Sequence, residues 1–401
     1  MSFTRISEIG EFALIDRLAT LIQPTESQLS TLKKGIGDDC AVIELPNGKL
    51  QVISTDLLIE QIHFDLLTTP LEHLGAKAIS VNVSDICAMN AKPLYATMSI
   101  GLSNNVSVEM IEQIYEGATR VAKQYGIAIV GGDTSASITG LVISVTIVGE
   151  VDADKITYRS GAKSGDFICI TGDVGRSFAG LKVLMRERQT MLDTFAENPD
   201  MDKSTYKADL SEYQKAIEKH LLPKARIDAV KFFHEAGIVP TSMIDVSDGV
   251  ASELKHLCRN SQTGALIEES KIPILSETRE VSDEFEDDGT TYALFGGEDY
   301  ELLFTISPND LEKLSAFKDI HIIGKVLDAS HGVKMRDLFG TDIDLQNTSG
   351  FQHFAEEDEH FFEDEDEHTH NGHDHDAHGR NGHNHNGHDD ADEDIWGERK
   401  N

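Results

Sequence analysis

Six short acidic motifs recur along this chain, most of them directly after an apolar run. They are Gly37-Asp38-Asp39, Ser54-Thr55-Asp56, Asn82-Val83-Ser84-Asp85, Gly131-Gly132-Asp133-Thr134, Asp245-Val246-Ser247-Asp248 and Gly296-Gly297-Glu298-Asp299. Carboxylates gathered at the ends of buried elements repel one another and are costly to desolvate, so they persist only where something cationic joins them. Few Lys or Arg residues stand beside these motifs in the sequence. The pattern therefore predicts bound Mg²⁺, a hard cation that takes oxygen ligands together with substrate phosphates and water.

Phosphoryl transfer is the chemistry that such a site suits best. Its transition state is loose and spreads charge over oxygen atoms, so catalysis consists mainly of positioning and charge neutralisation, which carboxylate-bound metal ions supply. The sequence has neither a G-x-x-x-x-G-K-[ST] phosphate loop nor the protein-kinase set of motifs. Acid–base hydrolysis of sugars needs only two carboxylates and aromatic platforms, and an aromatic content of 6% argues against it.

Two further side chains are candidates for substrate contact. His63, in Gln61-Ile62-His63-Phe64, follows Asp56 by seven positions; the alternative is a half-buried histidine without a functional role. Arg159, near the expected domain junction, is the best candidate for clamping a phosphate, because its guanidinium can bind two oxygens at once. The alternative is a surface ion pair, and residue type alone leaves both questions open.

The length of the chain predicts its number of domains, and its charge excludes some classes of binding partner. A chain of 401 residues predicts two domains plus extra segments, with the division between residues 150 and 151. The net charge is −35, and residues 355–401 alone hold 17 Asp and Glu against 3 Lys and Arg. This balance argues against a nucleic-acid or anionic-membrane surface. Four dispersed cysteines, no signal-peptide pattern and no apolar run of about 18 residues predict a cytoplasmic protein with reduced thiols.

Hydrophobic periodicity predicts an α/β protein with mixed sheets. Expected strands lie at 41–45, 50–54, 94–102, 141–149, 167–171 and 242–245, and expected helices at 70–90, 107–125, 175–187 and 223–236. In the helix over 70–90, Asp85 falls on the apolar stripe of Leu74, Ala78 and Val81, so its carboxylate is expected to point inward. Residues 188–220 are predicted to be an inserted helical excursion, and residues 278–291 an acidic loop.

Taken in order, the motifs resemble those of the thiamine-monophosphate kinase family, within the wider aminoimidazole ribonucleotide synthetase superfamily. The resemblance rests on the acidic motifs above together with Arg159-Ser160-Gly161-Ala162 and the closing Gly350-Phe351-Gln352-His353-Phe354, and it covers about residues 8–354. Each motif alone is weak, but seven in one order are specific. The insertion at 188–220 is longer than the family pattern, and the acidic segment before Gly296 is unusual.

The resemblance implies a fold, an activity and a set of site residues. The fold is a two-domain synthetase-like one, with domains 1–150 and 151–354 and with N-terminal sheets that join across a homodimer as a barrel. The activity is ATP-dependent conversion of thiamine monophosphate to thiamine diphosphate. The implied metal ligands are Asp39, Ser54, Thr55, Asp56, Asp85, Asp133, Asp245 and Asp248. The implied ATP contacts are Tyr115, Gly132, Asp133, Arg159 and Ser247, and the implied substrate contacts are His63, Glu298 and Phe351.

The C-terminal segment 355–401 has a different composition from the rest of the chain. It holds nine of the seventeen His residues and an imperfect repeat that begins at Asn371 and again at Asn381. High charge and few apolar residues predict disorder, and clustered imidazoles can bind Zn²⁺ or Ni²⁺. A solubilising tail and a metal-buffering tail both remain open.

Two other functions compete with the kinase. One is a different ATP-dependent enzyme of the same superfamily, such as one that makes selenophosphate or matures a hydrogenase. Such relatives are expected to carry a reactive Cys or Sec near the N-terminus or a Cys at the C-terminus, whereas Cys40 lies inside a metal motif and residues 355–401 contain no Cys. The other is a metal-storage protein that acts through the tail, which leaves the six acidic motifs unexplained.

Overall fold

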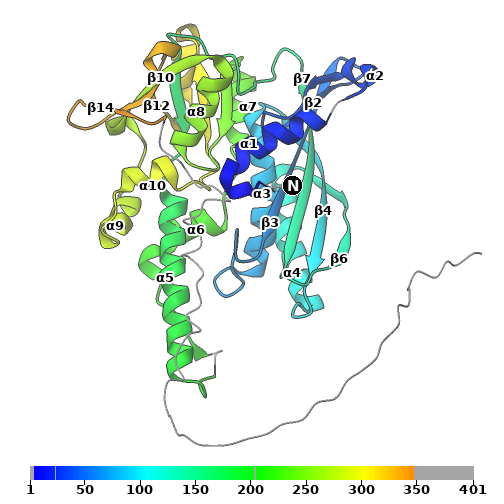
Figure 1. Cartoon of the computed structure of the whole chain (residues 1–401), viewed down its shortest axis with the longest axis vertical. Coiled ribbons are helices and arrows are strands. Elements are labelled where there is room, and N and C mark those ends of the chain that lie inside the picture. Colours follow the sequence, from blue (N-terminus) through cyan, green and yellow to red (C-terminus); the bar gives the residue numbers. More distant parts are fainter. Residues whose placement is uncertain (1–3, 23, 203–204, 347–401) are drawn as a thin grey trace, which may run out of the picture. The chain divides into compact units, whose positions relative to one another are not determined.

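Two seven-stranded sheets form the framework of the protein (Figure 1). The computed structural model describes residues 4–22, 24–202 and 205–346. Within these residues, the first half of the chain builds one sheet and the second half builds the other. This arrangement confirms the prediction of an α/β protein with mixed sheets.

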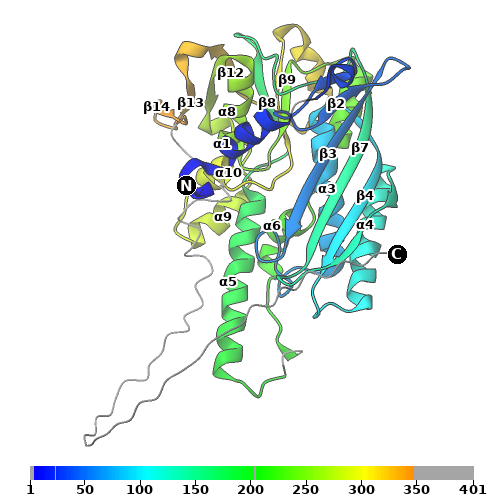
Figure 2. The same cartoon turned by 45° about the vertical axis from the view of Figure 1, so that its right-hand side comes forward.

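The first sheet is built on long antiparallel strands, which lie side by side in Figure 2. Its spatial order is β1-β2-β3-β7-β4-β5, and β6 also pairs with β4. The strands are β1 (Leu32–Lys34), β2 (Ala41–Glu44), β3 (Lys49–Ile59), β4 (Lys92–Leu102), β5 (Ala128–Gly131), β6 (Thr134–Ala136) and β7 (Val142–Asp152). Strands β2 and β3, predicted at 41–45 and 50–54, pair as an antiparallel hairpin, and the predicted strands at 94–102 and 141–149 are confirmed.

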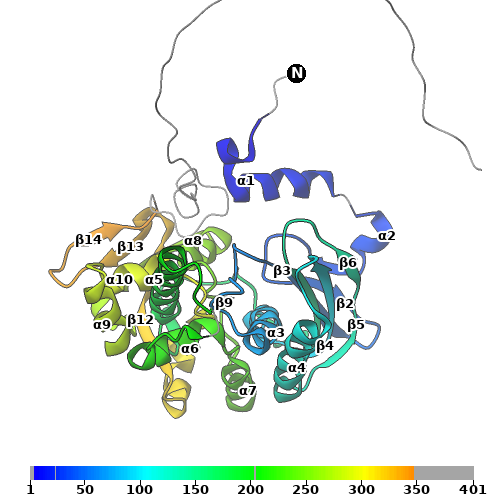
Figure 3. The ribbon, with the colours of Figure 1, turned by 90° about the horizontal axis from the view of Figure 1, so that it is seen from below.

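Two helices cover one face of this sheet (Figure 3). They are α3 (Leu71–Ala88) and α4 (Val108–Tyr125), which confirm the helices predicted at 70–90 and 107–125. The helices cross at two glycines: a Cβ added to Gly75 would lie 1.8 Å from the Ile114 carbonyl oxygen, and one added to Gly117 would lie 1.9 Å from that of Glu72. This close approach holds α3 firmly. The chain begins with α1 (Ile6–Leu21) and α2 (Glu26–Leu29).

The second sheet has the order β14-β13-β10-β12-β8-β11-β9. Only the β10–β13 pair is parallel among its described ladders. The strands are β8 (Phe167–Thr171), β9 (Ser242–Asp245), β10 (Thr263–Glu268), β11 (Leu302–Ile306), β12 (Ile320–Asp328), β13 (Val333–Arg336) and β14 (Asp342–Asp344). The predicted strands at 167–171 and 242–245 are confirmed.

The helices of the second half correct two predictions. They are α5 (Arg176–Glu197), α6 (Gln214–Leu221), α7 (Ile227–Ala236), α8 (Val250–Ser261), α9 (Ser276–Glu284) and α10 (Gly289–Phe295), with 3-10 turns at Ser211–Tyr213, Glu269–Lys271, Pro308–Ala316 and Ala329–His331. Helix α5 continues ten residues beyond the predicted end at 187. The loop predicted over 278–291 is wrong: α9 and the start of α10 occupy it, because Val281 and Tyr292 are buried while most of its acidic residues face solvent.

One apolar cluster joins the two halves. It contains Ile86 of α3 as well as Phe233 of α7 and Phe304 of β11, all fully buried. This shared core packs α3 against β9, so the halves meet at the end of α3. The domain boundary at residues 150 and 151 stays a prediction. None of the helices in the described ranges is long and apolar enough to cross a membrane.

Candidate metal centre

Three carboxylates from distant parts of the chain meet where α3 packs against β9. Asp39 precedes β2, Asp85 lies in the last turn of α3, and Asp245 ends β9. Oxygen atoms of all three lie within 4.8 Å of one another. The buried stripe of α3 directs Asp85 inward, as its spacing predicted, and the shared core brings β9 up to it. This carboxylate cluster is the centre of the candidate site.

The cluster is partly satisfied by neighbouring side chains. The hydroxyl of Ser54 on β3 donates to Asp85, while the Arg159 guanidinium donates to Oδ1 of Asp39 at 2.6 and 3.0 Å. The other carboxylate oxygen of Asp39, Oδ2, is buried and has no hydrogen-bond partner. Asp56 lies close enough for its charge to act on Asp85 and Asp245.

Burial makes these carboxylates hard to ionise. It raises the pKa of Asp39 to about 7 and the pKa values of Asp56 and Asp245 to about 6, and neighbouring carboxylates add to the shift for Asp39 and Asp245. Burial and the charge of Asp56 raise the pKa of Asp85 well above its ordinary value. Converging oxygen ligands, an unpartnered buried oxygen and mutual repulsion fit a hard divalent cation, which would favour the ionised forms.

The structure does not bring every predicted metal ligand into this cluster. Thr55 lies on the opposite face of the first sheet, where its hydroxyl is 3.0 Å from that of Thr146. Asp133 is exposed between β5 and β6. Asp248 is half-buried beside Glu253, whose carboxylate accepts a hydrogen bond from the Asp248 amide at 3.0 Å. The metal assignments of these residues stay predictions.

The residues predicted to contact the nucleotide lie in two places, one beside β4 and one near the carboxylate cluster. Tyr115 and Gly132 meet on β4: the Tyr115 hydroxyl donates to the Met98 carbonyl at 3.4 Å, and a Cβ on Gly132 would lie 1.8 Å from the same oxygen. Close backbone packing is thus sufficient reason for a glycine at 132. Arg159 and Ser247 lie instead near the carboxylates, since Arg159 contacts Asp39 and Ser247 contacts Glu253.

In the folded protein, Lys and Arg side chains do lie beside the acidic motifs, although few stand next to these motifs in the sequence. Arg159 pairs with Asp39, and Lys34 lies 3.3 Å from the buried carboxylate of Asp38. Lys77 of α3 contacts Glu298 at 2.9 Å. Arg159 and Lys77 are more than 100 positions from their partners, so sequence adjacency could not reveal either pair.

The Glu298 segment lies directly against the motif that contains Asp245. The Glu298 amide donates to the Ser247 carbonyl at 2.7 Å, and the Tyr300 amide donates to that of Val246 at 2.9 Å. Glu298 and Tyr300 have backbone φ values of 57° and 52°, which residues other than glycine rarely adopt. Such backbone strain concentrates at functional sites. His63 lies near enough to lower the pKa of Glu298, whereas Phe351 lies outside the described residues.

Sequence reasoning missed four buried polar residues around this site: Lys77, His220, Glu253 and Tyr300. A signal existed for Lys77, because it lies three positions after Leu74 and four before Val81 on the inward stripe of α3. Tyr300 is buried close to Asp56 and Asp245, whose charges help to raise its pKa after the larger effect of burial. No comparable signal marked the other residues.

Family models match most of the described chain. The N-terminal domain of AIR synthase related protein matches residues 37–151, and the C-terminal domain of that family matches residues 163–336. These matches account for both sheets and confirm the predicted two-domain synthetase-like fold.

Known proteins with this fold include close relatives of the chain. Thiamine-monophosphate kinase of Aquifex aeolicus is 34% identical over 80% of this chain and 93% of its own length, and that of Escherichia coli is 34% identical over 74% and 82%. A solved structure described as AaThiL complexed with AMPPCP and TMP has a TM-score of 0.73 at 33% identity, covering 88% of this chain and all of that one. Hydrogenase maturation protein HypE, at 19% identity and a TM-score of 0.59, shares the fold.

We expect Asp85→Asn to stabilise the metal-free protein and to abolish its stabilisation by Mg²⁺. The substitution removes one of several repelling buried charges, which is worth on the order of 1–3 kcal/mol. Wild-type protein should gain about 2.7 kcal/mol when Mg²⁺ is present at 100 times its dissociation constant, whereas the variant should gain almost nothing. Chemical denaturation at pH 8, with and without Mg²⁺, measures both effects. The exposed Asp154→Asn is the control and should behave as wild type.

We also expect the metal-free protein to lose stability as pH rises from 5 to 8. The folded-state pKa of Asp39 is about 7 and those of Asp56 and Asp245 are about 6, all above the ordinary value of 3.8. The folded state therefore holds protons that the unfolded chain has released, and this stabilisation is lost as pH rises through 6–7. Added Mg²⁺ should restore stability most strongly at pH 8, because binding at pH 6 must first displace protons. Denaturation midpoints that are flat with pH would contradict the cluster.

Proposed function

This chain belongs to the thiamine-monophosphate kinase family, and we propose that it transfers the terminal phosphoryl group of ATP to thiamine monophosphate, forming thiamine diphosphate and ADP. The observation that carries the proposal is the carboxylate cluster of Asp39, Asp85 and Asp245. Its relatives of known function bear the name of this activity, and one relative has been solved with AMPPCP, an ATP analogue, and TMP.

The carboxylate cluster supplies what phosphoryl transfer requires. Asp39, Asp85 and Asp245 would hold Mg²⁺, with Ser54 and Asp56 beside them. Thr55, Asp133 and Asp248, which lie outside the cluster, are proposed as ligands of further ions that arrive with the nucleotide. Bound Mg²⁺ neutralises the charge that develops on the phosphate oxygens. The protein's own part is to hold the carboxylates in place: Ser54 orients Asp85, and the β9 ladder orients Asp245.

Arg159 is the best placed of the proposed nucleotide contacts. In the structure its guanidinium donates to Asp39. A phosphate oxygen and Asp39 would compete for the same N–H groups, so nucleotide binding would release Asp39 toward a metal ion. Tyr115, Gly132, Asp133 and Ser247 complete the proposed ATP site, and His63, Glu298 and Phe351 the proposed substrate site.

We propose direct in-line transfer without a phosphorylated protein intermediate. A phosphate oxygen of thiamine monophosphate forms the new P–O bond while the bond to the leaving ADP breaks. The Cys40 thiol is one candidate for a protein nucleophile beside the cluster, since its Sγ lies 3.6 Å from the Asp85 carbonyl oxygen. Burial and the surrounding carboxylates raise its pKa well above the ordinary value, so it is held as an unreactive thiol.

The competing functions receive less support. The likeness to hydrogenase maturation protein shows the fold alone, whereas relatives about a third identical are named as the kinase. A metal-storage protein would have no use for a strained Glu298 segment beside the cluster. The His-rich segment lies outside the described residues, and we propose that it binds Zn²⁺ or Ni²⁺ independently of the kinase site.

We further propose a cytoplasmic homodimer that joins through the face of the first sheet opposite α3 and α4. Leu57, Tyr95 and Val130 are 49%, 52% and 60% exposed, while their sequence neighbours Leu58 and Ala96 are buried against the helices. Because successive strand residues point to opposite faces, the three exposed side chains share the open face. Four free and buried cysteines support a reducing compartment.

We expect the protein to convert thiamine monophosphate to thiamine diphosphate, with one ADP formed per product. Asp245→Asn should lower kcat by about 100-fold or more, because it removes an electrostatic contact to the transition state. Product chromatography and coupled ADP detection measure the reaction. Asp154→Asn and the chain ending at residue 354 are controls that should remain active. ADP formation only with a different acceptor, or a labelled phosphoprotein after incubation with ATP, would contradict the proposal.

We expect Leu57→Arg to convert the dimer to a monomer. A buried, unpaired guanidinium in the middle of an apolar interface costs several kcal/mol of association free energy. Light scattering after gel filtration measures the mass. Lys123→Glu, on the exposed surface of α4, is the control and should leave the mass unchanged. A monomeric wild-type protein at micromolar concentration would overturn the proposed interface.

A further inference from the structure

Lys77 is a lysine enclosed within the protein. Its residue is only 2% exposed, and it lies near the middle of α3 on the inward face. Lysine is almost never fully buried without a partner, because its charge is strongly hydrated. The ammonium group lies 2.9 and 3.1 Å from the two carboxylate oxygens of Glu298 and 3.3 Å from the His63 carbonyl oxygen. Lys77 thus connects two of the three residues that are proposed to contact the substrate, Glu298 and His63.

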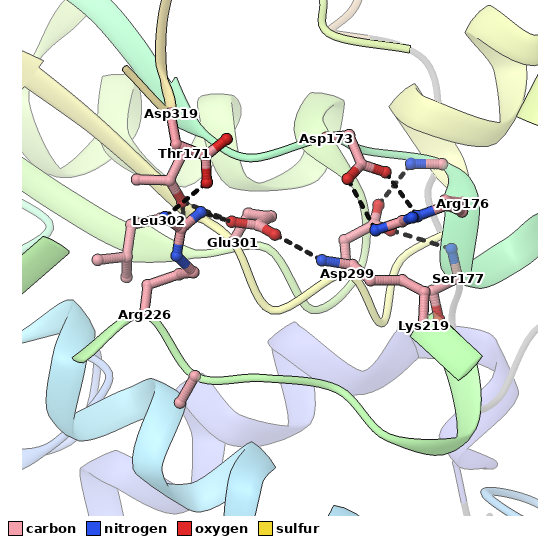
Figure 4. A network of polar contacts seen from close by, with 12 residues as sticks. Thr171, Asp173, Arg176, Ser177, Lys219, Arg226, Asp299, Glu301, Leu302 and Asp319 are labelled. Atoms are coloured by element: carbon pink, nitrogen blue, oxygen red, sulfur yellow. Dashed lines mark hydrogen bonds and ion pairs between the residues drawn. The ribbon is translucent and has the colours of Figure 1, made fainter. Parts of the chain in front are cut away.

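Asp299 and Glu301, which follow Glu298, hold its segment to helices of the second half of the chain (Figure 4). Asp299 accepts hydrogen bonds from the Gly175 amide at 2.6 Å and the Ser177 amide at 3.1 Å, at the start of α5. Glu301 is held by Arg226 at 2.6 Å and by Lys219 at 2.5 Å. The Glu298 side chain, by contrast, reaches toward α3. This anchoring maintains the positive φ of Glu298.

Among the described residues, the charged or titratable groups against Glu298 include Lys77 of α3, His220 of α6, His63 after β3, and Tyr300. Burial alone would raise the pKa of Glu298, but Lys77, His220 and His63 outweigh it and the pKa is lowered. Burial lowers the pKa of His220 to about 4, so its ring is neutral at pH 7; its Nδ1 lies 3.1 Å from a carboxylate oxygen of Glu298 and 3.3 Å from the Ser177 hydroxyl.

The charges in this group cancel. Glu298 is ionised, yet the ammonium of Lys77 neutralises it at hydrogen-bond distance, and His220 adds no charge. A carboxylate in this state is a strong hydrogen-bond acceptor but a weak counter-ion for a cation. The Glu298 side chain is 24% exposed, which leaves part of it accessible to a ligand.

We propose that Lys77 is a positioning residue of the substrate site, which holds Glu298 as an acceptor for an uncharged N–H donor of the substrate, such as the amino group of the aminopyrimidine ring. Glu298 does not then serve as the counter-ion of the thiazolium ring. This inference rests on the proposed function, because it requires Glu298 to contact thiamine monophosphate.

The test compares Lys77→Met with Lys77→Arg in the full-length protein. Methionine fills a similar volume without charge, so Glu298 should be protonated at neutral pH and become ionised only as pH rises. At pH 7 we expect the KM for thiamine monophosphate to rise about 10- to 100-fold, the effect of losing a charged hydrogen bond, with kcat changed less than about threefold. The KM of Lys77→Met should fall again toward pH 9, while wild type and Lys77→Arg stay flat.

Substrate analogues decide which group Glu298 recognises. Replacing the pyrimidine amino group by a carbonyl should weaken binding to wild-type protein about 10-fold or more, and this discrimination should shrink in Lys77→Met. Affinity is measured calorimetrically in the presence of Mg²⁺ and a non-hydrolysable ATP analogue. If an analogue with a neutral ring in place of the thiazolium loses affinity while the carbonyl analogue does not, Glu298 is a counter-ion and the proposal is overturned.

Lys219→Met is the matched control. Lys219 is a second buried lysine that pairs with a glutamate, Glu301, in the same half of the protein as Glu298. Its loss should lower the melting temperature but leave the KM independent of pH. The same pH-dependent KM in both variants would mean that Lys77 has only a structural role.

A double variant separates failure of this inference from failure of the proposed function. If Glu298→Gln leaves the KM unchanged, Glu298 does not contact the substrate and the proposed substrate site is wrong. If Glu298→Gln raises the KM while Lys77→Met does not, only the role of Lys77 is overturned. Should Lys77→Met not fold, Lys77→Met combined with Glu298→Gln removes both buried charges; its KM should equal that of Glu298→Gln alone, and an additional increase would contradict the proposal.

Discussion

The packing of like-charged carboxylates between the two sheets is the constraint on which the rest of the structure depends. Asp85 of α3 and Asp245 of β9 can meet only if the first and second halves share one apolar core, and they do so through residues such as Ile86 and Phe304. That core forces the carboxylates out of water and raises their pKa values. The fold thereby brings together buried carboxylates that repel one another, and a bound cation would reduce this repulsion.

Some carboxylates around the site are neutralised by Lys and Arg side chains of the protein, whereas others are left partly unpaired. The half-buried Glu298 is paired with Lys77, and the buried Glu301 with Lys219 and Arg226, so these carboxylates are neutralised without a ligand. At the carboxylate cluster, Arg159 satisfies only one oxygen of Asp39 and leaves the other without a partner. The protein thus completes its own ion pairs around Glu298 and Glu301 and leaves them incomplete at the candidate metal centre.

Backbone strain is present in the segment that joins these two regions. Glu298 and Tyr300 have positive φ values, while Asp299 and Glu301 are anchored by the start of α5 and by buried cations. A backbone held in this way presents Glu298 toward α3 with little freedom. Lys77 and Asp85 of the carboxylate cluster lie on the same helix, so α3 relates the position of the proposed substrate site to that of the candidate metal site.

The amino-acid sequence by itself determined the elements and the family. Periodicity located α3, α4 and six of the fourteen strands in the described residues, because one buried face imposes a regular spacing, and seven ordered motifs indicated the family. It misjudged residues 278–291, where acidic side chains on the solvent face of α9 concealed the buried Val281. Only the tertiary structure decided which acids converge and which cations meet them. Pairs such as Arg159 with Asp39 and Lys77 with Glu298 are separated by 120 and 221 positions, and no local pattern encodes contacts that arise when two sheets pack on one core.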